Sequence, residues 1–395
     1  MIYEAPVLDE SELRVLGLVD ELRVALRDRV AEPRRWSGGL RRVTFARAVQ
    51  ASNSIEGYNA TLEDVVAAVD GEDLLDADTE TRLAVAGYRD AMTYVLQLAQ
   101  DDAWVVDETL LKALHFMMLR HDLSKNPGRW RPGAIFVRRE PSGEIGYEGP
   151  SSDLVPGLIH GLLDQLATSD SPVLVKAAMA HLNLVMIHPF RDGNGRMARC
   201  LQTLVLAKES VAMPVFSSIE EYLGRNTLAY YDVLAEVERG SWHPERSAAP
   251  WIRFCLTAHY RQAKTLLRRY HEYERLYRDC AELARARVLP ERAIAALMDA
   301  AIELRIRNGG YRKAVAVSEA EEISELTATR DLKALVEASL LSPVGERRGR
   351  FYVASPELRA MWAAIRDERP PRFGDDPFEI AAVGGALDAA ATAAE

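Results

Sequence analysis

Apolar residues recur at helical spacings along most of the chain. Between residues 9 and 31 leucines and valines return every three or four positions, a pattern typical of one buried helix face. Thr61 followed by Asp64 predicts the capped start of another helix. The same periodicity predicts further helices at about 40–52, 79–99, 107–120, 153–168, 171–187, 195–208, 226–238 and 248–284. The sequence therefore predicts a mainly α protein.

The pattern changes between Trp130 and Gly149. Two short apolar runs, 134–137 and 145–147, flank a turn-forming segment at 139–143, which is typical of a β-hairpin. An isolated hairpin is only marginally stable in water. We therefore expect the hairpin to pack on the helices, in the position of a flap over a ligand.

After the long helix at 248–284, three helical segments and a second pair of apolar runs follow. This part resembles a winged helix-turn-helix module, with 324–337 as the recognition helix and 345–352 as the wing. Between Arg285 and Val353 the chain has 12 Arg and Lys against 10 Asp and Glu, so no strongly basic face is expected for DNA. A role in protein contact or as a spacer is at least as well supported as DNA binding.

Composition and charge narrow the class of protein. The 395 residues are 48% apolar and 27% charged, which indicates an ordinary globular chain of two or three domains. A net charge of −10 does not favour nucleic-acid binding. No apolar run is long enough for a membrane span, and the acidic start lacks a secretory pattern, so the expected location is cytoplasmic. Cys200, Cys255 and Cys280 are widely spaced, and we expect three buried thiols.

The segment from His188 to Arg199 carries the chemistry. A predicted helix at 173–187 is apolar nearly all round and should be buried. Pro189 disfavours the helical conformation for the residue before it, so this helix should end at His188. Gly193 and Gly195 permit backbone conformations that other residues avoid, and a second helix follows them. The segment is therefore a helix, a glycine-rich loop and a helix.

This arrangement suits a phosphate. The second helix begins with unpaired N–H groups and the positive end of its dipole. Arg196 and Arg199 are three positions apart and share one helix face. Asp192 offers a hard oxygen ligand for Mg²⁺, and His188 has the acid–base range to take a hydroxyl proton. Each feature alone also occurs in ordinary turns and cores, but their combination within twelve residues favours phosphate chemistry.

The run HPFRDGNGRMAR resembles the signature of the Fic family at all its defining positions, and the resemblance covers roughly residues 40–240. It implies a mainly helical fold with a hairpin flap. It also implies these roles: His188 as general base, Asp192 as Mg²⁺ ligand, Phe190 as a packing residue, Gly193, Asn194 and Gly195 around an anion hole, and Arg196 and Arg199 on phosphates. Tyr230 and Tyr231 resemble a tyrosine pair that often follows the motif, where nucleotide contact and core packing are equal alternatives.

The resemblance implies a protein adenylyltransferase that moves AMP from ATP to a Ser, Thr or Tyr hydroxyl, with Mg²⁺ as cofactor. The hairpin would align the target segment as an added strand. Removal of AMP, transfer of another phosphate-containing group, and a nucleotide-sensing transcription regulator are the alternatives. The target is a protein, with the chain itself among the candidates, and a homodimer is one alternative for the assembly.

A second motif lies upstream. Ser52 to Gly57 resembles the inhibitory motif of the family, a Ser followed four residues later by Glu and then by Gly. Ser52 and Glu56 are one helical turn apart, so both can face one site. The resemblance implies that Glu56 pairs with Arg199 and blocks seating of the γ-phosphate. A helix end capped by Gly57 also fits the same residues.

Together these patterns predict five consecutive parts. They are an N-terminal helical region with the inhibitory helix at 1–105, a catalytic core at 106–245, a connecting helix at 246–286, a winged helix-turn-helix module at 287–368 and a tail at 369–395.

Overall fold

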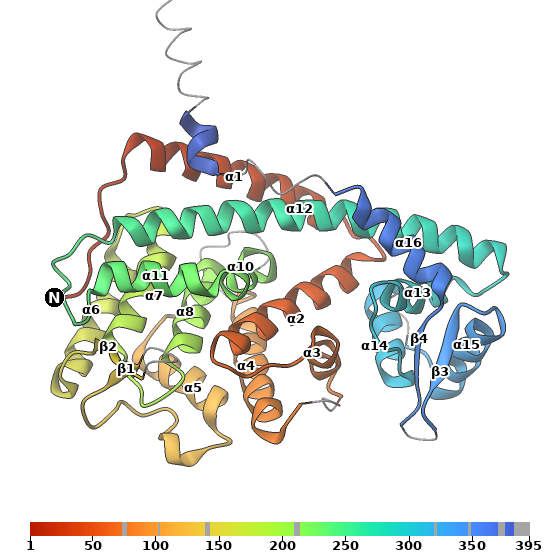
Figure 1. Ribbon diagram of the computed structural model, residues 1–395, viewed down its shortest axis with the longest axis horizontal. Coiled ribbons are helices and arrows are strands. Elements are labelled where there is room, and N and C mark those ends of the chain that lie inside the picture. The colour runs from red at the N-terminus through yellow and green to blue at the C-terminus, as the bar shows by residue number, and fades with distance from the viewer. Residues whose placement is uncertain are drawn as a thin grey trace, which may run out of the picture.

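The computed structural model describes residues 1–72, 77–101, 103–138, 143–208, 214–319, 322–346, 349–369 and 376–382. These residues form a mainly α molecule with two small antiparallel hairpins, as the sequence predicts. Figure 1 shows a larger and a smaller body joined by one long helix, α12 (Ala249–Ala286). Within this described part of the chain, no helix is both long and apolar enough to cross a bilayer.

The larger body precedes α12 in the sequence. In chain order it contains α1 (Glu10–Ala31), α2 (Ser37–Ile55), α3 (Leu62–Val69), α4 (Thr79–Leu98), α5 (Glu108–Leu119), η1 (Leu123–Lys125), β1 (Phe136–Arg138), β2 (Ile145–Glu148), η2 (Ser152–Leu154), α6 (Val155–Thr168), α7 (Val173–Ile187), α8 (Asn194–Lys208), α9 (Pro214–Ser217), α10 (Glu220–Arg225) and α11 (Thr227–Glu238). The predicted helices of this body are confirmed within a few residues, whereas α10 was not predicted.

Helix starts in this body coincide with side-chain caps. Asp9 accepts a hydrogen bond from the Glu12 N–H, and Glu12 reaches back to the Asp9 N–H, which forms a complete capping box. Thr61 accepts from the Asp64 N–H, as the sequence predicts for α3. Each such bond satisfies a donor that the first turn would otherwise leave unpaired, and typically contributes about 1 kcal/mol.

The core of the larger body is built on the pair α7 and α8. Both helices are buried on almost every side, which agrees with the unbroken apolar run predicted for α7. α12 lies across this pair and is tied to it by Trp251, whose Nε1 donates to the Ala178 carbonyl at 2.8 Å. The three cysteines are free and buried, as predicted: Cys200 in α8, and Cys255 and Cys280 in α12.

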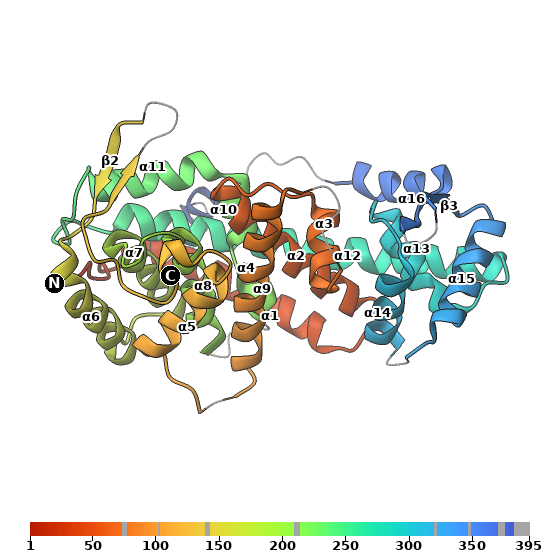
Figure 2. The same ribbon diagram turned by 90° about the horizontal axis from the view of Figure 1, so that it is seen from below.

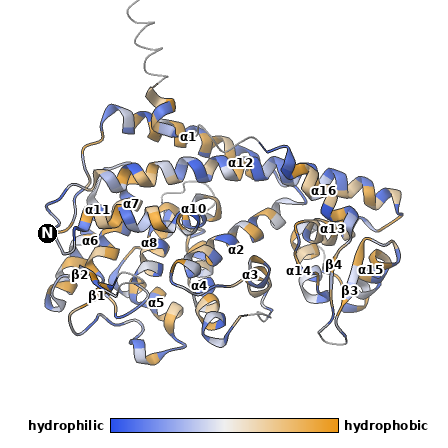
Figure 3. Cartoon of the chain, viewed as in Figure 1, coloured by the Kyte–Doolittle hydropathy of each residue, from blue (hydrophilic) through white to orange (hydrophobic). Residues whose placement is uncertain are grey.

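α12 is a spine of 38 residues that contributes to both hydrophobic cores. Hydrophobic and hydrophilic positions alternate along it (Figure 3), because one face packs on the bodies and the other remains polar. α1 runs beside α12 (Figure 1), and the contact between these two helices is extensive. The long helix therefore fixes the position of the smaller body relative to the larger one.

The first hairpin, β1 with β2, stands out from the larger body, at the end away from the smaller body (Figure 2). Val137 pairs with Tyr147 in its antiparallel register, and a bulge follows. Tyr147 is buried and donates its hydroxyl to the Met186 carbonyl of α7 at 2.6 Å. The predicted packing of the hairpin on helices is thus achieved, while residues 139–142 of its predicted turn lie outside the described residues.

The smaller body follows α12. It contains η3 (Glu291–Ala293), α13 (Ile294–Ala301), α14 (Asn308–Glu319), α15 (Glu325–Glu337), β3 (Leu341–Val344), β4 (Phe351–Ala354) and α16 (Pro356–Asp367). Ile306 forms an antiparallel bridge with Tyr352, beside the β3–β4 pair. The winged-helix assignment stays a prediction. Residues 347 and 348 of the predicted wing, and most of the predicted tail, lie outside the described residues. α16 was not predicted.

Candidate active site

The loop between α7 and α8 has the backbone that its sequence predicts. α7 ends at His188, which adopts the left-handed conformation at φ 51° and ψ 56°. Gly193 has a φ of 73°, where a side chain would be strained and would also press on Leu119. α8 then begins at Asn194, so its first N–H groups face the loop. The predicted helix, loop and helix are therefore present.

Asn194 holds the loop together from inside. Its Oδ1 accepts from the Phe190 N–H at 2.9 Å, and its Nδ2 donates to the Phe190 carbonyl at 3.0 Å. Phe190 is fully buried and stacks on His115 with ring centroids 3.6 Å apart, in the packing role implied for it. Because the Asn194 side chain is used within the loop, only its backbone N–H could serve the predicted anion hole, and that role stays a prediction.

His115 is a bracing residue that the sequence reasoning missed. Its Nδ1 accepts from the Gly128 N–H at 2.8 Å, so the ring proton is on Nε2 and donates to the Asp192 carbonyl at 2.9 Å. Burial lowers the pKa of His115 to about 4, which keeps the ring neutral in this role. The histidine lies 77 positions before Asp192, and no local pattern links the two.

Arg131 was missed as well, although it connects the motif loop to the base of the hairpin. Its Nε donates to the His188 carbonyl at 2.8 Å, and its Nη1 donates to the Gly133 carbonyl at 2.6 Å. Its backbone N–H donates to the Pro189 carbonyl at 2.9 Å. The buried guanidinium therefore sets where the hairpin stands relative to His188.

One ring nitrogen of His188 is fixed by a hydrogen bond. Its Nδ1 lies 2.9 Å from the Val185 carbonyl, which can only accept, so Nδ1 carries the proton and the Nε2 lone pair remains available. Burial lowers the pKa of His188 below its usual range. The imidazole is therefore neutral at pH 7 and can take a proton from a hydroxyl at Nε2.

Arg196 and Arg199 are buried cations that point into the site. Arg196 is fully buried beside the Tyr58 ring, with its guanidinium carbon 4.9 Å from the ring centroid. Its Nε and Nη1 have no hydrogen-bond partner among the described residues, and neither does Nη1 of Arg199. Unpaired buried cationic donors are costly unless an anion completes them. The two arginines are therefore available to an anion, and their predicted role on nucleotide phosphates stays a prediction.

Asp192 is held by Lys125, another residue that sequence reasoning missed. Its Oδ2 lies 2.8 Å from the Lys125 Nζ, and its Oδ1 accepts from the Gly193 N–H at 2.6 Å. Burial alone would raise the pKa of Asp192, but Lys125 and Arg196 lower it below its usual range. Across the described ranges no group of three or more metal-binding side chains exists. One ionised carboxylate fits Mg²⁺, which takes its other ligands from phosphates and water.

The upstream motif meets the loop in space. Glu56, at the C-terminal end of α2, accepts from the Arg199 Nη2 at 2.6 Å. Ser52 accepts from the same guanidinium twice, through its hydroxyl at 2.8 Å and its carbonyl at 2.9 Å. A Cβ at Gly195 would clash with the Glu56 carboxylate, so this glycine is what lets Glu56 reach the start of α8. Residues 143 positions apart thus share one site.

The two predicted tyrosines occupy different environments. Tyr230 is buried, and its hydroxyl lies 2.9 Å from the His181 Nε2 in the core. Tyr231 is 46% exposed and donates its hydroxyl to the Ile55 carbonyl at 3.1 Å, at the end of α2. Both hydroxyls are therefore used within the protein. Their contact with a nucleotide stays a prediction, and Tyr231 is the one whose position permits it.

The histidine, the arginine pair and the loop between them define a helical protein with a candidate site at a helix–loop–helix segment. Residues 105–206 match the Fic/DOC family, so this part of the chain is a Fic domain. The chain is similar to protein adenylyltransferase Fic of Nematostella vectensis, with 26% identity over 250 residues, which are 60% of this chain and 54% of that protein. It is similar to protein adenylyltransferase fic-1 of Caenorhabditis elegans, with 28% identity over 159 residues, which are 39% and 30% of the two chains.

Solved structures show the same fold. A Fic family protein from Desulfovibrio desulfuricans superposes with a TM-score of 0.56 and 22% identity, over 90% of this chain and 99% of that one. A Fic domain-containing signaling protein from Bacteroides thetaiotaomicron gives a TM-score of 0.51 and 20% identity, over 66% and 97% of the two chains. The chain spans about half, or less, of the length of the curated relatives it matches.

Proposed function

We propose that this protein transfers AMP from ATP to a hydroxyl group of a target protein. One observation carries the proposal: a neutral His188 shares a site with two buried arginines, each of which keeps at least one nitrogen without a partner among the described residues. A base and a phosphate cradle are the two requirements of in-line attack on phosphorus. The names of the curated relatives agree with this chemistry.

The reaction consumes only ATP and the target hydroxyl. His188 Nε2 takes the proton of the target hydroxyl as its oxygen attacks the α-phosphorus of ATP. The new oxygen–phosphorus bond forms as the bond to the β-phosphate oxygen breaks, and pyrophosphate leaves. Arg196, Arg199 and the first N–H groups of α8 stabilise the charge on the phosphate oxygens. The proton on His188 then returns to solvent.

Asp192 is the residue that would hold Mg²⁺. Bound there, the ion would neutralise part of the charge of the ATP phosphates. Lys125 neutralises Asp192 in the structure at 2.8 Å. The Asp192 side chain is 35% exposed, so it is accessible to a cation.

Autoinhibition by Glu56 is part of the proposal. The Arg199 guanidinium donates to Glu56 and twice to Ser52, so it is largely engaged before any nucleotide arrives. A γ-phosphate must compete with the Glu56 carboxylate for this arginine, and the two anions repel each other. ATP would then bind without its α-phosphorus aligned for attack, and basal transfer would be low.

The target would align along β1. All three residues of this strand are exposed, and its outer edge has no strand partner among the described residues. An extended segment can add to such an edge by backbone hydrogen bonds. The Arg131 contacts at the base of the hairpin would then bring the hydroxyl of the added segment toward His188.

The test is incubation of the Glu56→Gly variant with ATP labelled on either the α- or the γ-phosphate, followed by intact mass spectrometry. Transfer of AMP predicts that the α-label stays on protein, the γ-label leaves as pyrophosphate, and the mass rises by one AMP group. Protein that keeps the γ-label would show phosphoryl transfer and overturn the proposal. His188→Ala in the same background is the control for non-enzymatic labelling.

Removal of AMP is the second candidate. Glu56 lies close enough to His188 for its negative charge to raise the pKa of the imidazole against the effect of burial, so the two groups face one space. A carboxylate there can orient a water for attack on an AMP–protein bond. Protein modified by the Glu56→Gly variant should lose AMP on addition of wild type if this activity exists, and should keep it otherwise.

The smaller body is proposed to contact protein rather than DNA. Its helix α15 presents a mixed outer surface that includes Leu326, which is 59% exposed, beside Thr329, Arg330 and Lys333. A DNA-reading helix would need a more uniformly basic face. Fluorescence anisotropy of the full chain with random and selected duplexes tests this assignment. A tight, sequence-specific complex would instead favour the alternative of a nucleotide-sensing transcription regulator.

A further inference from the structure

A second group of arginines surrounds a cavity that the motif loop does not line. The cavity has a volume of about 190 Å³ and lies where α2, α10, α12 and α16 converge. In Figure 1, α12 runs from the larger body, which contains α2 and α10, to the part of the molecule where α16 lies beside it. Since a water molecule needs roughly 10–15 Å³ by this measure, the cavity holds on the order of ten water-sized groups. Its arginines are Arg47, Arg225, Arg268, Arg269, Arg366 and Arg369.

Two carboxylates, Glu221 and Glu272, hold several of these arginines. Glu221 accepts from Arg269 through both oxygens at 2.6 Å and also from Arg225. Burial would raise the pKa of Glu221, but Arg269 and its neighbours lower it to about 2, so it is ionised. Glu272 accepts from Arg369 through both oxygens, at 2.7 and 2.8 Å. Arg225, Arg269 and Arg369 are therefore engaged by carboxylates.

Arg47 is the least satisfied of the six. Its nearest carboxylate oxygen, on Glu221, is 3.9 Å away, beyond hydrogen-bond distance. Its Nε is buried without a partner among the described residues. Burial and the nearby Arg269 lower the pKa of Arg47 to about 10, which shows how poorly its charge is balanced. The Arg47 side chain is 28% exposed, so an anion that enters the cavity can reach it.

Arg47 faces the cavity because of its place on α2. Leu40, Val43, Thr44 and Arg47 follow each other at helical spacing and all line the cavity. From the opposite side, α16 contributes Arg366, which makes no ion pair with any described residue. Two under-used guanidinium groups thus approach one space from two separate helices. Planar guanidinium groups suit phosphate oxygens, which they bind in pairs of parallel hydrogen bonds.

We propose that this cavity is a second anion site, which binds a small polyanion bearing two or more phosphate groups. Arg47 and Arg366 approach from separate helices, so each can bind a different phosphate group of one occupant. A di- or triphosphate supplies two such groups on one molecule. The occupant would connect the larger body, α12 and α16 through charge-assisted hydrogen bonds.

This site is separate from the one that carries the proposed transfer. Its residues lie on α2, α10, α12 and α16 and after them, whereas the motif arginines lie on α8. The proposal needs no activity of the enzyme, so it stands or fails independently of AMP transfer. It concerns inorganic polyphosphates and nucleoside phosphates alike, because the cavity arginines recognise the phosphate chain that both share.

The experiment is calorimetric titration of the full chain with inorganic tripolyphosphate, ADP and AMP, without divalent metal. Wild type should bind tripolyphosphate at two sites. Arg199→Met should remove the motif site, and the double change Arg47→Met with Arg366→Met should weaken the other by about tenfold or more. AMP, with one phosphate, should bind the cavity much more weakly than tripolyphosphate. Equal binding of ADP and tripolyphosphate would assign the site to nucleotides as well as inorganic chains.

A matched control removes the same charge from the same part of the surface. Arg278→Met with Arg359→Met replaces two exposed arginines on α12 and α16 that do not line the cavity, and should leave both sites intact. Arg366→Met alone, at an exposed position, tests the site if the double variant unfolds. The proposal is overturned if cavity and control variants bind tripolyphosphate equally, if Arg199→Met removes all binding, or if only long nucleic acids bind.

Discussion

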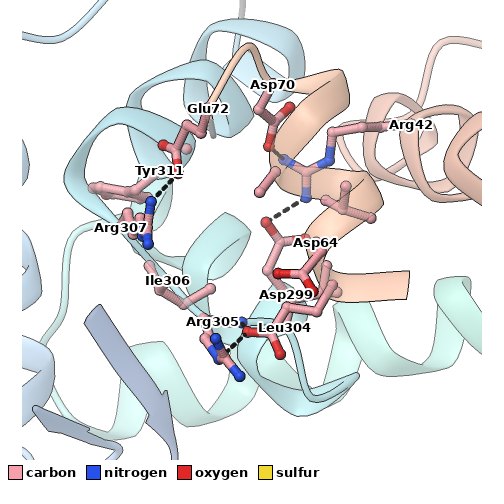
Figure 4. A pocket seen from close by; sticks show the side chains of 14 residues that line it. Arg42, Asp64, Asp70, Glu72, Asp299, Leu304, Arg305, Ile306, Arg307 and Tyr311 are labelled. Atoms are coloured by element: carbon pink, nitrogen blue, oxygen red, sulfur yellow. Dashed lines mark hydrogen bonds and ion pairs between the residues drawn. The ribbon is translucent and has the colours of Figure 1, made fainter. Parts of the chain in front are cut away.

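The two ends of α2 are held by the rest of the protein in different ways. At its C-terminal end, Glu56 reaches Arg199 through one 2.6 Å contact, and that arginine keeps a buried nitrogen without a partner among the described residues. At its N-terminal end, Arg42 lies between Asp299 at 2.5 Å and Asp70 at 3.3 Å. Figure 4 shows this arginine directed between the two carboxylates.

The N-terminal end is part of a larger contact between the two bodies. Figure 4 also shows Glu72 facing Arg307, and the two groups are 3.4 Å apart. Gly38 packs so closely on Val317 of α14 that a side chain at this glycine would not fit without a shift. The acidic and basic groups here are paired with one another, and the apolar contact excludes a larger residue. This end is therefore an anchor.

The difference indicates where regulation can act. Glu56 is 25% exposed and can leave Arg199 by a side-chain rotation, while Arg42 and its partners are almost fully buried. A phosphate can replace the carboxylate at Arg199, but no small ligand replaces the contact between the bodies. We therefore expect α2 to stay in place when Glu56 is displaced, so that inhibition depends on one side chain and not on movement of a helix.

The largest effect is expected at the site that the C-terminal end of α2 faces. His188→Ala in a Glu56→Gly background should lower labelling by about 10²–10⁴-fold, because the hydroxyl loses its base. ATP affinity should change little, because His188 acts on the incoming group. Quantitative autoradiography with α-labelled ATP measures the rate, and His160→Ala, on the exposed surface of α6, is the control. An unchanged rate would remove His188 from the mechanism.

The next largest effect is expected at the anchor, on the free energy of unfolding. Arg42→Met should lower the free energy of unfolding by about 3 kcal/mol, because Asp70 and Asp299 would be left as buried carboxylates without their cation. Urea unfolding measures this loss, and Arg27→Met, at an exposed position on α1, should show almost none. Labelling by the folded variant should remain low. A rise comparable to that of Glu56→Gly would mean that the anchor end controls inhibition.

Much of the fold follows from the sequence because the signals are local. Periodicity locates the buried helix α7, and Pro189 with Gly193 and Gly195 gives the turn after it. α10 has only six residues, too few to show a repeat, and it was not predicted. α16 was missed even though Ser355 and Pro356 form a recognisable start, with the Ser355 hydroxyl accepting from Leu358.

Only the site residues that lie within the one motif could be predicted from the sequence. His188, Asp192 and the two arginines lie within twelve consecutive residues, so their chemistry can be interpreted together. Lys125, by contrast, contacts Asp192 from a different segment, and nothing in its local sequence distinguishes it from a surface lysine. The buried residues His115 and Arg131 also contact the motif loop from distant segments, and no local pattern identifies them. Contacts of this kind are set by packing, which a single sequence does not encode at fixed spacing.

The contact at the C-terminal end of α2 should be strong enough to control the rate but not the fold. Glu56→Gly should raise self-labelling by about 5–150-fold, the range of a typical coupling between two binding events. Arg199→Ala in the same protein should cancel the gain, because the γ-phosphate loses its holder. Glu56→Gln, which keeps the shape and removes the charge, should fall between the two. A decrease in self-labelling by the Glu56→Gly variant would favour AMP removal or a structural role for Glu56.

The smallest expected effect is on the pH dependence of stability, which Asp70 at the anchor influences. Burial raises the pKa of Asp70 to about 6, and the nearby charges of Asp299 and Glu72 add to this, while Arg42 opposes it. The folded state therefore holds a proton that the unfolded chain releases near its ordinary value of 3.8. For an acid with a raised pKa, the stabilisation is fully present below the unfolded pKa and is lost as pH rises through 6.

Between pH 5 and pH 7 this loss amounts to about 1 kcal/mol of unfolding free energy. Asp70→Asn cannot ionise, so the variant should lose this part of the pH dependence, while its amide can still contact Arg42. Urea unfolding at half-unit steps of pH measures the slope, and Asp28→Asn, at an exposed position on α1, should keep the slope of the wild type. Identical slopes in wild type and Asp70→Asn would mean that Asp70 is already ionised at pH 5. The N-terminal end of α2 would then be held by charge alone, in the same manner as the end at Arg199.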